Sequence, residues 1–175
     1  HTPPGSGGGG VEQHTLGLVH SLAQTKGDDI EFLLYVDDPN PEWLRPYIGD
    51  HMELVIPDER SAIDKAKQQV TELAKRVARP ILTRQDFHTH LRPDPTVPDA
   101  NGRFAELGAD IVHFPSPPFY RTELPTIFSP HDLQHRHYPE FFRQRTLDRR
   151  NVIYPAGCNE SDLVVVPSTF VKRDV

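Results

Sequence analysis

A histidine and an aspartate, His131 and Asp132, directly follow a short apolar run in the sequence. The run, Leu124 to Phe128, is typical of a buried strand, and Pro130 cannot donate a hydrogen bond to a neighbouring strand, so the strand is expected to end there. Both polar residues then lie on the loop at the carboxyl end of a strand, where open α/β sheets bind their ligands. The alternative is a loop histidine that is only hydrogen-bonded by the neighbouring aspartate.

A second candidate is the glycine-rich stretch from Gly5 to Gly10, which leads into a helix expected from Val11. Backbone N–H groups at the start of a helix attract anions, and glycine lets a phosphate or a sugar approach closely. The stretch lacks the lysine of a GxxxxGK[ST] phosphate loop and has no convincing GxGxxG register. A solvated loop therefore stays open as the alternative to a ligand-binding one.

Histidine is abundant, with ten residues in the chain, which raises the question of a metal site. The His88-Thr-His90 run is similar to the H-x-H of metal-dependent amidohydrolases such as dihydroorotases. That fold needs most of a (β/α)₈ barrel after the motif, and only 85 residues follow His90. No histidine pair has a metal-ligand spacing on a convincing helix or strand. The sequence therefore predicts neither a bound metal nor a cofactor.

Other reactive side chains give weaker signals. No G-x-S-x-G elbow accompanies the serines. Cys158 has no cationic neighbour in the sequence, which favours an ordinary buried thiol over a nucleophile. A basic run is expected on the helix after Pro139, either as a solvated face or as a contact with an anionic acceptor or a membrane surface. The run consists of Arg143, Arg145, Arg149 and Arg150.

Composition limits the class of protein. The chain has 175 residues, a net charge of −6, 36% apolar residues and 18 prolines, which fits one domain with extensive loops. The acidic balance argues against nucleic acid as the main partner. No apolar run reaches the roughly 20 residues of a membrane span, and no signal peptide is visible. The single cysteine excludes an internal disulfide and fits a reducing compartment. These features predict a soluble, cytoplasmic α/β domain.

Apolar runs alternate with helical stripes along the chain. This alternation predicts a parallel sheet with helices on both faces. Helices are expected near residues 11–27 and 61–79, from Pro139 to a kink or end at Pro155 and Gly157, and after a Ser168 cap. Residues 80–107 are expected to be mostly loop. The expected strands cover residues 30–36, 52–56, 111–114, 124–128 and 163–166.

Several of these pieces, taken in order, resemble one family. The Gly9-Gly10-Val11-Glu12 start of the first helix resembles the GG-x-E start of family 4 (group 1) retaining glycosyltransferases. Residues 109–114 and 124–135 resemble the fourth and fifth strand regions of that family. The stretch from Ser161 to Asp174 resembles its AD-x-V-x-x-S strand end. The resemblance covers residues 7–26 and 109–175 well, and residues 28–108 loosely.

The resemblance implies a fold and an activity. The fold would be the Rossmann-like amino-terminal half of a GT-B enzyme, which transfers a sugar from a nucleotide-sugar to an acceptor with retention and without a bound metal. His131 would line the reaction centre near the donor sugar, and Gly9 and Gly10 would approach the donor. His113 and Asp132 would border the acceptor side. Catalysis would rest on positioning and on stabilisation of an oxocarbenium-like centre.

The chain departs from the family pattern in two ways. The family's first strand, which precedes the glycine loop, and its carboxyl-terminal donor-binding domain are not found in the 175 residues. We therefore expect residues 1–175 to be a single partial domain, truncated at both ends and inactive as a transferase by itself. The alternatives are a nucleotide-sugar epimerase of the same fold and a non-catalytic α/β binding module.

Overall fold

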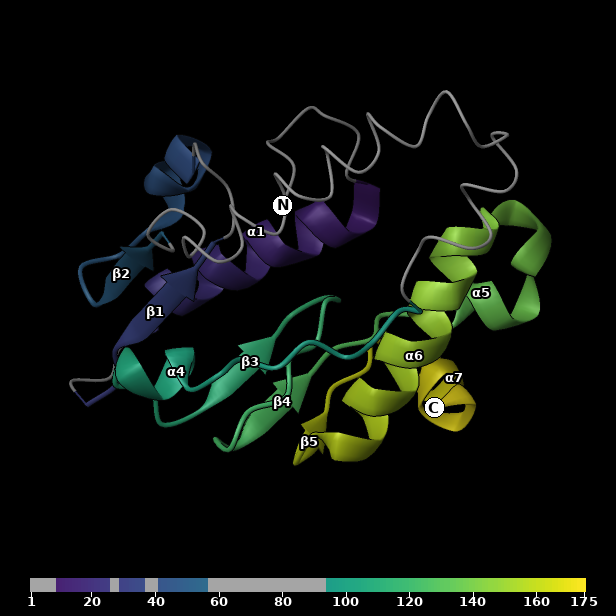
Figure 1. The fold of residues 1–175 in the computed structure, drawn as a ribbon. Coiled ribbons are helices and arrows are strands. Elements are labelled where there is room, and N and C mark those ends of the chain that lie inside the picture. The colour runs from purple at the N-terminus through teal and green to yellow at the C-terminus, as the bar shows by residue number, and fades with distance from the viewer. Residues whose placement is uncertain (1–8, 26–28, 37–40, 57–93) are drawn as a thin grey trace, which may run out of the picture. The chain divides into compact units, whose positions relative to one another are not determined.

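Helices and parallel strands alternate along the chain, which confirms the predicted α/β class (Figure 1). A computed structural model describes residues 9–25, 29–36, 41–56 and 94–175. Their contacts fall into two compact units. The first unit is Lys26–Asp94, and the second combines Thr2–Thr25 with Pro95–Val175.

The first unit contains a two-stranded parallel sheet. Strands β1 (Phe32–Tyr35) and β2 (Met52–Val55) pair in register from Phe32 opposite Met52 to Tyr35 opposite Val55. A 3-10 helix, η1 (Pro41–Tyr47), connects them and buries Leu44. Both strands were predicted from the sequence, although each is shorter than expected. Val36 and Met52 are also buried, so apolar side chains of both strand regions cover this small sheet.

The second unit contains a three-stranded parallel sheet in the order β3-β4-β5. Its strands are β3 (Val112–Phe114), β4 (Thr126–Phe128) and β5 (Leu163–Val164), and all three were predicted. Figure 1 shows them side by side, with β4 in the middle. The sequence led us to expect one sheet that also included residues 30–36. In the described residues β1 pairs with β2 instead, so the parallel strands form two sheets.

Aromatic rings form the core of the second unit. Phe128, in the central strand, is completely buried. Its ring centroid lies 5.7 Å from that of Phe119 and 6.3 Å from that of Tyr154. Phe119 in turn contacts Phe114 of β3 at 5.1 Å. Burying one such ring stabilises the fold by roughly 1.5–3 kcal/mol. Pro130 is also fully buried and ends β4 as predicted, so the core fixes the position at which the chain leaves the sheet.

Two helices of the second unit differ from the sequence-based expectation. Helix α1 (Gly9–Ala23) begins two residues before Val11, so Gly9 and Gly10 form its first turn instead of a loop. Its buried face is made by Thr15, Leu16 and Val19, whereas Val11 is exposed. Helix α4 (Arg103–Glu106) is a single turn within the stretch that was expected to be loop.

The helix expected from Pro139 is divided. Helix α5 (Gln134–His137) comes first, Pro139 opens the 3-10 helix η2 (Pro139–Phe141), and helix α6 (Gln144–Glu160) follows. Of the predicted kink or end at Pro155 and Gly157, the end is wrong, because α6 continues through both residues. Pro155 is exposed, so water can satisfy the carbonyl that loses its N–H partner. The helix is held instead by its buried face, which consists of Ile153, Tyr154, Ala156 and Gly157.

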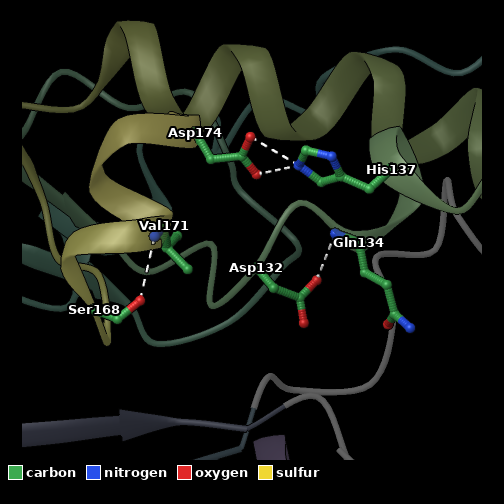
Figure 2. A network of polar contacts seen from close by, with 6 residues as sticks. All are labelled: Asp132, Gln134, His137, Ser168, Val171 and Asp174. Atoms are coloured by element: carbon green, nitrogen blue, oxygen red, sulfur yellow. Dashed lines mark hydrogen bonds and ion pairs between the residues drawn. The ribbon is translucent and has the colours of Figure 1, made fainter.

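The last helix, α7 (Thr169–Asp174), confirms the predicted cap. The Ser168 hydroxyl accepts a hydrogen bond from the Val171 N–H at 3.2 Å, as Figure 2 shows. This bond satisfies one of the free donors at the start of the helix. The predicted helix at 61–79 and the His88-Thr-His90 run lie outside the described residues.

Candidate functional site

His131 occupies the predicted position on the loop after β4. It adopts a left-handed backbone conformation with φ +64° and is half-buried. Its Nε2 lies 2.7 Å from the carbonyl oxygen of Pro115, the residue that follows β3. A carbonyl oxygen only accepts, so Nε2 must donate, and the neutral ring then has Nδ1 as its acceptor. The neighbour that holds His131 is therefore a backbone carbonyl and not Asp132.

His14 of α1 contacts His131. The two ring centroids are 4.8 Å apart and the rings are nearly perpendicular, at 86°. His14 was not among the residues predicted from the sequence, although it lies only four residues after Gly10. Four residues are about one helical turn, or about 6 Å along the axis. The contact therefore brings the glycine-rich start of α1 close to the loop that carries His131.

His113 of β3 is the third histidine of the cluster. Its Nε2 lies 3.1 Å from the hydroxyl oxygen of Ser129, a buried residue at the end of β4. Desolvation, and secondarily the charge of His14, lower the pKa of His113 from its ordinary value of 6.5. The His113 imidazole is therefore mostly neutral at pH 7. His113 and Ser129 thus add polar side chains beside the His131 loop, and the acceptor-side role of His113 remains a proposal.

Asp132 faces the backbone of the following helix. Its carboxylate accepts a hydrogen bond from the Gln134 N–H at 3.0 Å (Figure 2). Its own N–H donates to the Pro130 carbonyl at 2.9 Å. The two hydrogen bonds together form the turn that leads into α5. Asp132 is exposed, so its second carboxylate oxygen is accessible from solvent. The structure therefore shows a structural role for Asp132, and its acceptor-side role remains a proposal.

The two candidate glycines lie in the first turn of α1. A Cβ built on Gly10 would meet no atom of the described residues within 4 Å. Packing among the described residues therefore does not require glycine there. An approaching ligand would supply a reason for it, and that role of Gly9 and Gly10 also remains a proposal.

The sequence alone predicts His135 and His137 on the loop downstream of His131, exposed to solvent, but both lie on α5. For His135 the expectation of solvation is wrong. It is only 3% exposed, packs against the Tyr154 ring at 4.7 Å, and its Nδ1 has no hydrogen-bond partner in the described part of the chain. Burial, followed by the charge of Arg150, lowers its pKa. His137 is exposed and contacts the Asp174 carboxylate at 2.7 Å.

A separate cavity of about 360 Å³ lies at the amino-terminal ends of β4 and β5, away from the His131 loop. Arg121 and Glu160 face each other at its wall through two hydrogen bonds of 2.7 Å. The Arg121 hydrogen bond lowers the pKa of Glu160. Both side chains are exposed, and the Arg121 guanidinium and the Glu160 carboxylate are hydrogen-bonded to each other. Few of their donors and acceptors are therefore left to bind a ligand in the cavity.

Metal and thiol chemistry receive no support from the described residues. Within 9–25, 29–36, 41–56 and 94–175, no three His, Cys, Asp or Glu side chains are grouped for metal binding. Cys158 is half-buried, and burial raises the pKa of its thiol. A raised pKa leaves less thiolate at neutral pH, in agreement with the expected unreactive thiol.

A sequence model of the family described as Glycosyltransferase Family 4 matches residues 8–175. No curated protein and no solved structure matches the chain. Among the described helices, none is long and apolar enough to cross a membrane.

Proposed function

The chain belongs to glycosyltransferase family 4, and on that premise we propose that it is the acceptor-side half of a retaining, nucleotide-sugar-dependent enzyme. The observation that carries the proposal is the convergence of His14, His113 and His131 around the carboxyl ends of β3 and β4. This edge is where parallel α/β sheets bind ligands. A further domain of the full-length protein would bind the donor nucleotide.

The chemistry of the cluster suits a sugar. Sugars present hydroxyl groups, which both donate and accept hydrogen bonds, and a neutral imidazole has one nitrogen of each kind. The Pro115 carbonyl fixes the tautomer of His131, so its Nδ1 is available to accept from a hydroxyl. Fixed dipoles of this kind also stabilise the positive charge that develops as the donor's glycosidic bond breaks.

The backbone of His131 supports a functional role. A left-handed conformation at a residue other than glycine costs on the order of 1–3 kcal/mol and tends to persist at functional sites. Glycine would avoid this cost, but it has no imidazole. We propose that His131 contacts the donor sugar at the reaction centre, while Gly9 and Gly10 allow the donor to approach. His113 and Asp132 would face the acceptor.

The experiment uses the full-length protein, incubated with nucleotide-sugars in the presence and absence of candidate acceptors. Transfer with retention predicts that release of nucleotide depends on an acceptor and that the product keeps the anomeric configuration of the donor, as read from NMR coupling constants. Conversion of the donor to an epimer without an acceptor would contradict the proposal and favour the epimerase. Donor or acceptor binding without any turnover would favour a non-catalytic binding module.

A further inference from the structure

Three exposed aromatic residues lie together on the α5, η2 and α7 region of the second unit. Tyr138, Phe141 and Phe170 are 53%, 71% and 65% exposed. The Tyr138 and Phe141 rings stack at 5.9 Å, and the His137 ring lies 6.4 Å from Tyr138 and 6.3 Å from Phe170. We name these four residues the aromatic patch. Such apolar area is costly to expose, and contiguous examples mark interaction sites.

Two polar contacts fix the segments that carry the aromatic patch. The His137 Nε2 contacts both carboxylate oxygens of Asp174, at 2.8 and 2.7 Å, and this links α5 to α7 (Figure 2). Ser168 caps α7 and fixes the turn from which Phe170 projects. The exposed rings therefore lie on anchored helices.

Positive charge is concentrated in the chain segment that carries Tyr138 and Phe141. Residues 136–150 contain five arginines and only two carboxylates, in a chain whose net charge is −6. Helix α6 has no acidic residue in its first turn, where its dipole is positive; Arg145 lies in that turn and Arg143 is the N-cap residue. This arrangement is unfavourable for the helix alone and favourable for an anionic partner. The arginines that are exposed are Arg136, Arg143, Arg145 and Arg149.

We propose that the aromatic patch and the adjoining arginines bind the surface of an anionic membrane. Aromatic side chains favour the headgroup region of a bilayer, and arginines near the surface are attracted to anionic lipids. The combination of exposed aromatic rings with nearby exposed arginines is typical of proteins that lie on a membrane without crossing it. This inference is independent of the proposed sugar transfer.

The ring geometry favours a membrane over nucleic acid. Bases bind single-stranded-nucleic-acid proteins by stacking on open aromatic faces. The Tyr138 and Phe141 rings stack on each other, so one face of each ring is covered. Insertion between lipid headgroups needs exposed apolar area and not a free ring face.

The test is co-sedimentation of the full-length protein with vesicles of phosphatidylcholine alone or of phosphatidylcholine mixed with phosphatidylserine. We expect binding to the mixed vesicles only, and weaker binding at high salt because the Debye length shortens. Phe141→Ala should reduce binding severalfold. The double variant Arg143→Gln with Arg145→Gln should reduce it by at least tenfold, since each arginine near an anionic surface contributes about fivefold.

Matched control variants test whether a loss of vesicle binding is specific to the aromatic patch and its arginines, or follows from any loss of exposed apolar area or positive charge. Ile111→Ala removes another exposed apolar side chain outside the aromatic patch. Ala105→Glu with Asn159→Asp lowers the net charge by the same two units at exposed positions elsewhere. Both controls should bind like the unmodified protein. Equal binding to neutral vesicles, no binding, or losses as large in the controls would overturn the proposal. Phe141-dependent binding of an RNA oligonucleotide, or Phe141-dependent dimerisation, without vesicle binding would also overturn it.

Discussion

Gly157 of α6 lies directly against the ring of Phe128 in β4. A Cβ on residue 157 would be 2.5 Å from Cε1 and 2.6 Å from Cδ1 of Phe128, much closer than real contacts allow. The Phe128 ring is completely buried between Phe119 and Tyr154, so it cannot move aside without disturbing the core. The absence of a side chain at Gly157 therefore lets α6 pack closely against the central strand of the second unit's sheet.

The first prediction follows from this close packing. Gly157→Ala should lower the free energy of unfolding by about 1–3 kcal/mol, because overpacking a filled core costs that much. The measurement is denaturant or thermal unfolding. Gly17→Ala in α1 is the control, since a Cβ there meets nothing within 4 Å, and alanine should stabilise the helix by about 0.5–1 kcal/mol. Equal effects of the two substitutions would contradict the packing argument.

The second prediction concerns His131. His131→Asn keeps a residue that tolerates a positive φ and removes the imidazole. If the ring serves the transition state, kcat should fall roughly 100-fold or more, and the melting temperature should change by only a few degrees. Activity and thermal melting of the full-length enzyme are measured together. A variant with normal kcat would end the catalytic assignment.

The third prediction concerns His14, the member of the cluster that lies on α1. His14→Ala should lower kcat/KM by roughly tenfold or more, because it removes the ring that contacts His131. Stability should hold or rise slightly, since His14 is exposed and alanine is the better helix former. His20→Ala, an exposed histidine on the same helix, is the matched control and should leave kcat/KM nearly unchanged. Similar losses in both variants would point to α1 as a whole.

The fourth prediction is a pH dependence of stability that arises from His135. Its pKa in the folded protein is lowered from 6.5, first by burial and then by Arg150, while Asp132 and Asp174 act in the opposite direction. The unfolded chain therefore binds more protons near pH 6, and the stability falls as the pH drops through about 6.5. His113, whose pKa is also lowered, acts in the same sense.

The His135→Phe variant tests this pH dependence, because it keeps a ring against Tyr154 but cannot take up a proton. Its melting temperature should fall less than that of the unmodified protein between pH 7.5 and pH 5.5. His20→Phe, at an exposed position, is the control and should leave the pH profile unchanged. An unaltered profile in His135→Phe would contradict the assignment.

The sequence predicted those parts of the fold that local patterns encode. The strand before His131 was correctly placed because its apolar run and Pro130 are adjacent in sequence. The Ser168 cap depends only on residues within one helical turn, and it was also predicted. His113 was named from the family resemblance; it lies opposite Ile127 of β4, with its Nε2 near the Ser129 hydroxyl, and its role stays a proposal.

The sequence did not predict features that depend on distant contacts. His14 and His131 are 117 residues apart, and no local pattern records their contact. Burial of His135 was missed because α5 is a short, polar segment without apolar periodicity, and its burial comes from packing against Tyr154 of α6. Helix α6 continues through Pro155 because packing of its buried face overrides the local preference of proline.

The division of the second unit into two chain segments has a consequence for the order of folding. The 69 residues of Lys26–Asp94 separate α1 from the other elements with which it clusters. Closing a loop of that length costs about 4 kcal/mol in chain entropy beyond a constant term, and halving it would recover only ~0.6 kcal/mol. The sheet and α6 can form from contacts within Pro95–Val175, so docking of α1 is expected to come late. His14 would then be the last of the three histidines to arrive, and the cluster would be complete only at the end of folding.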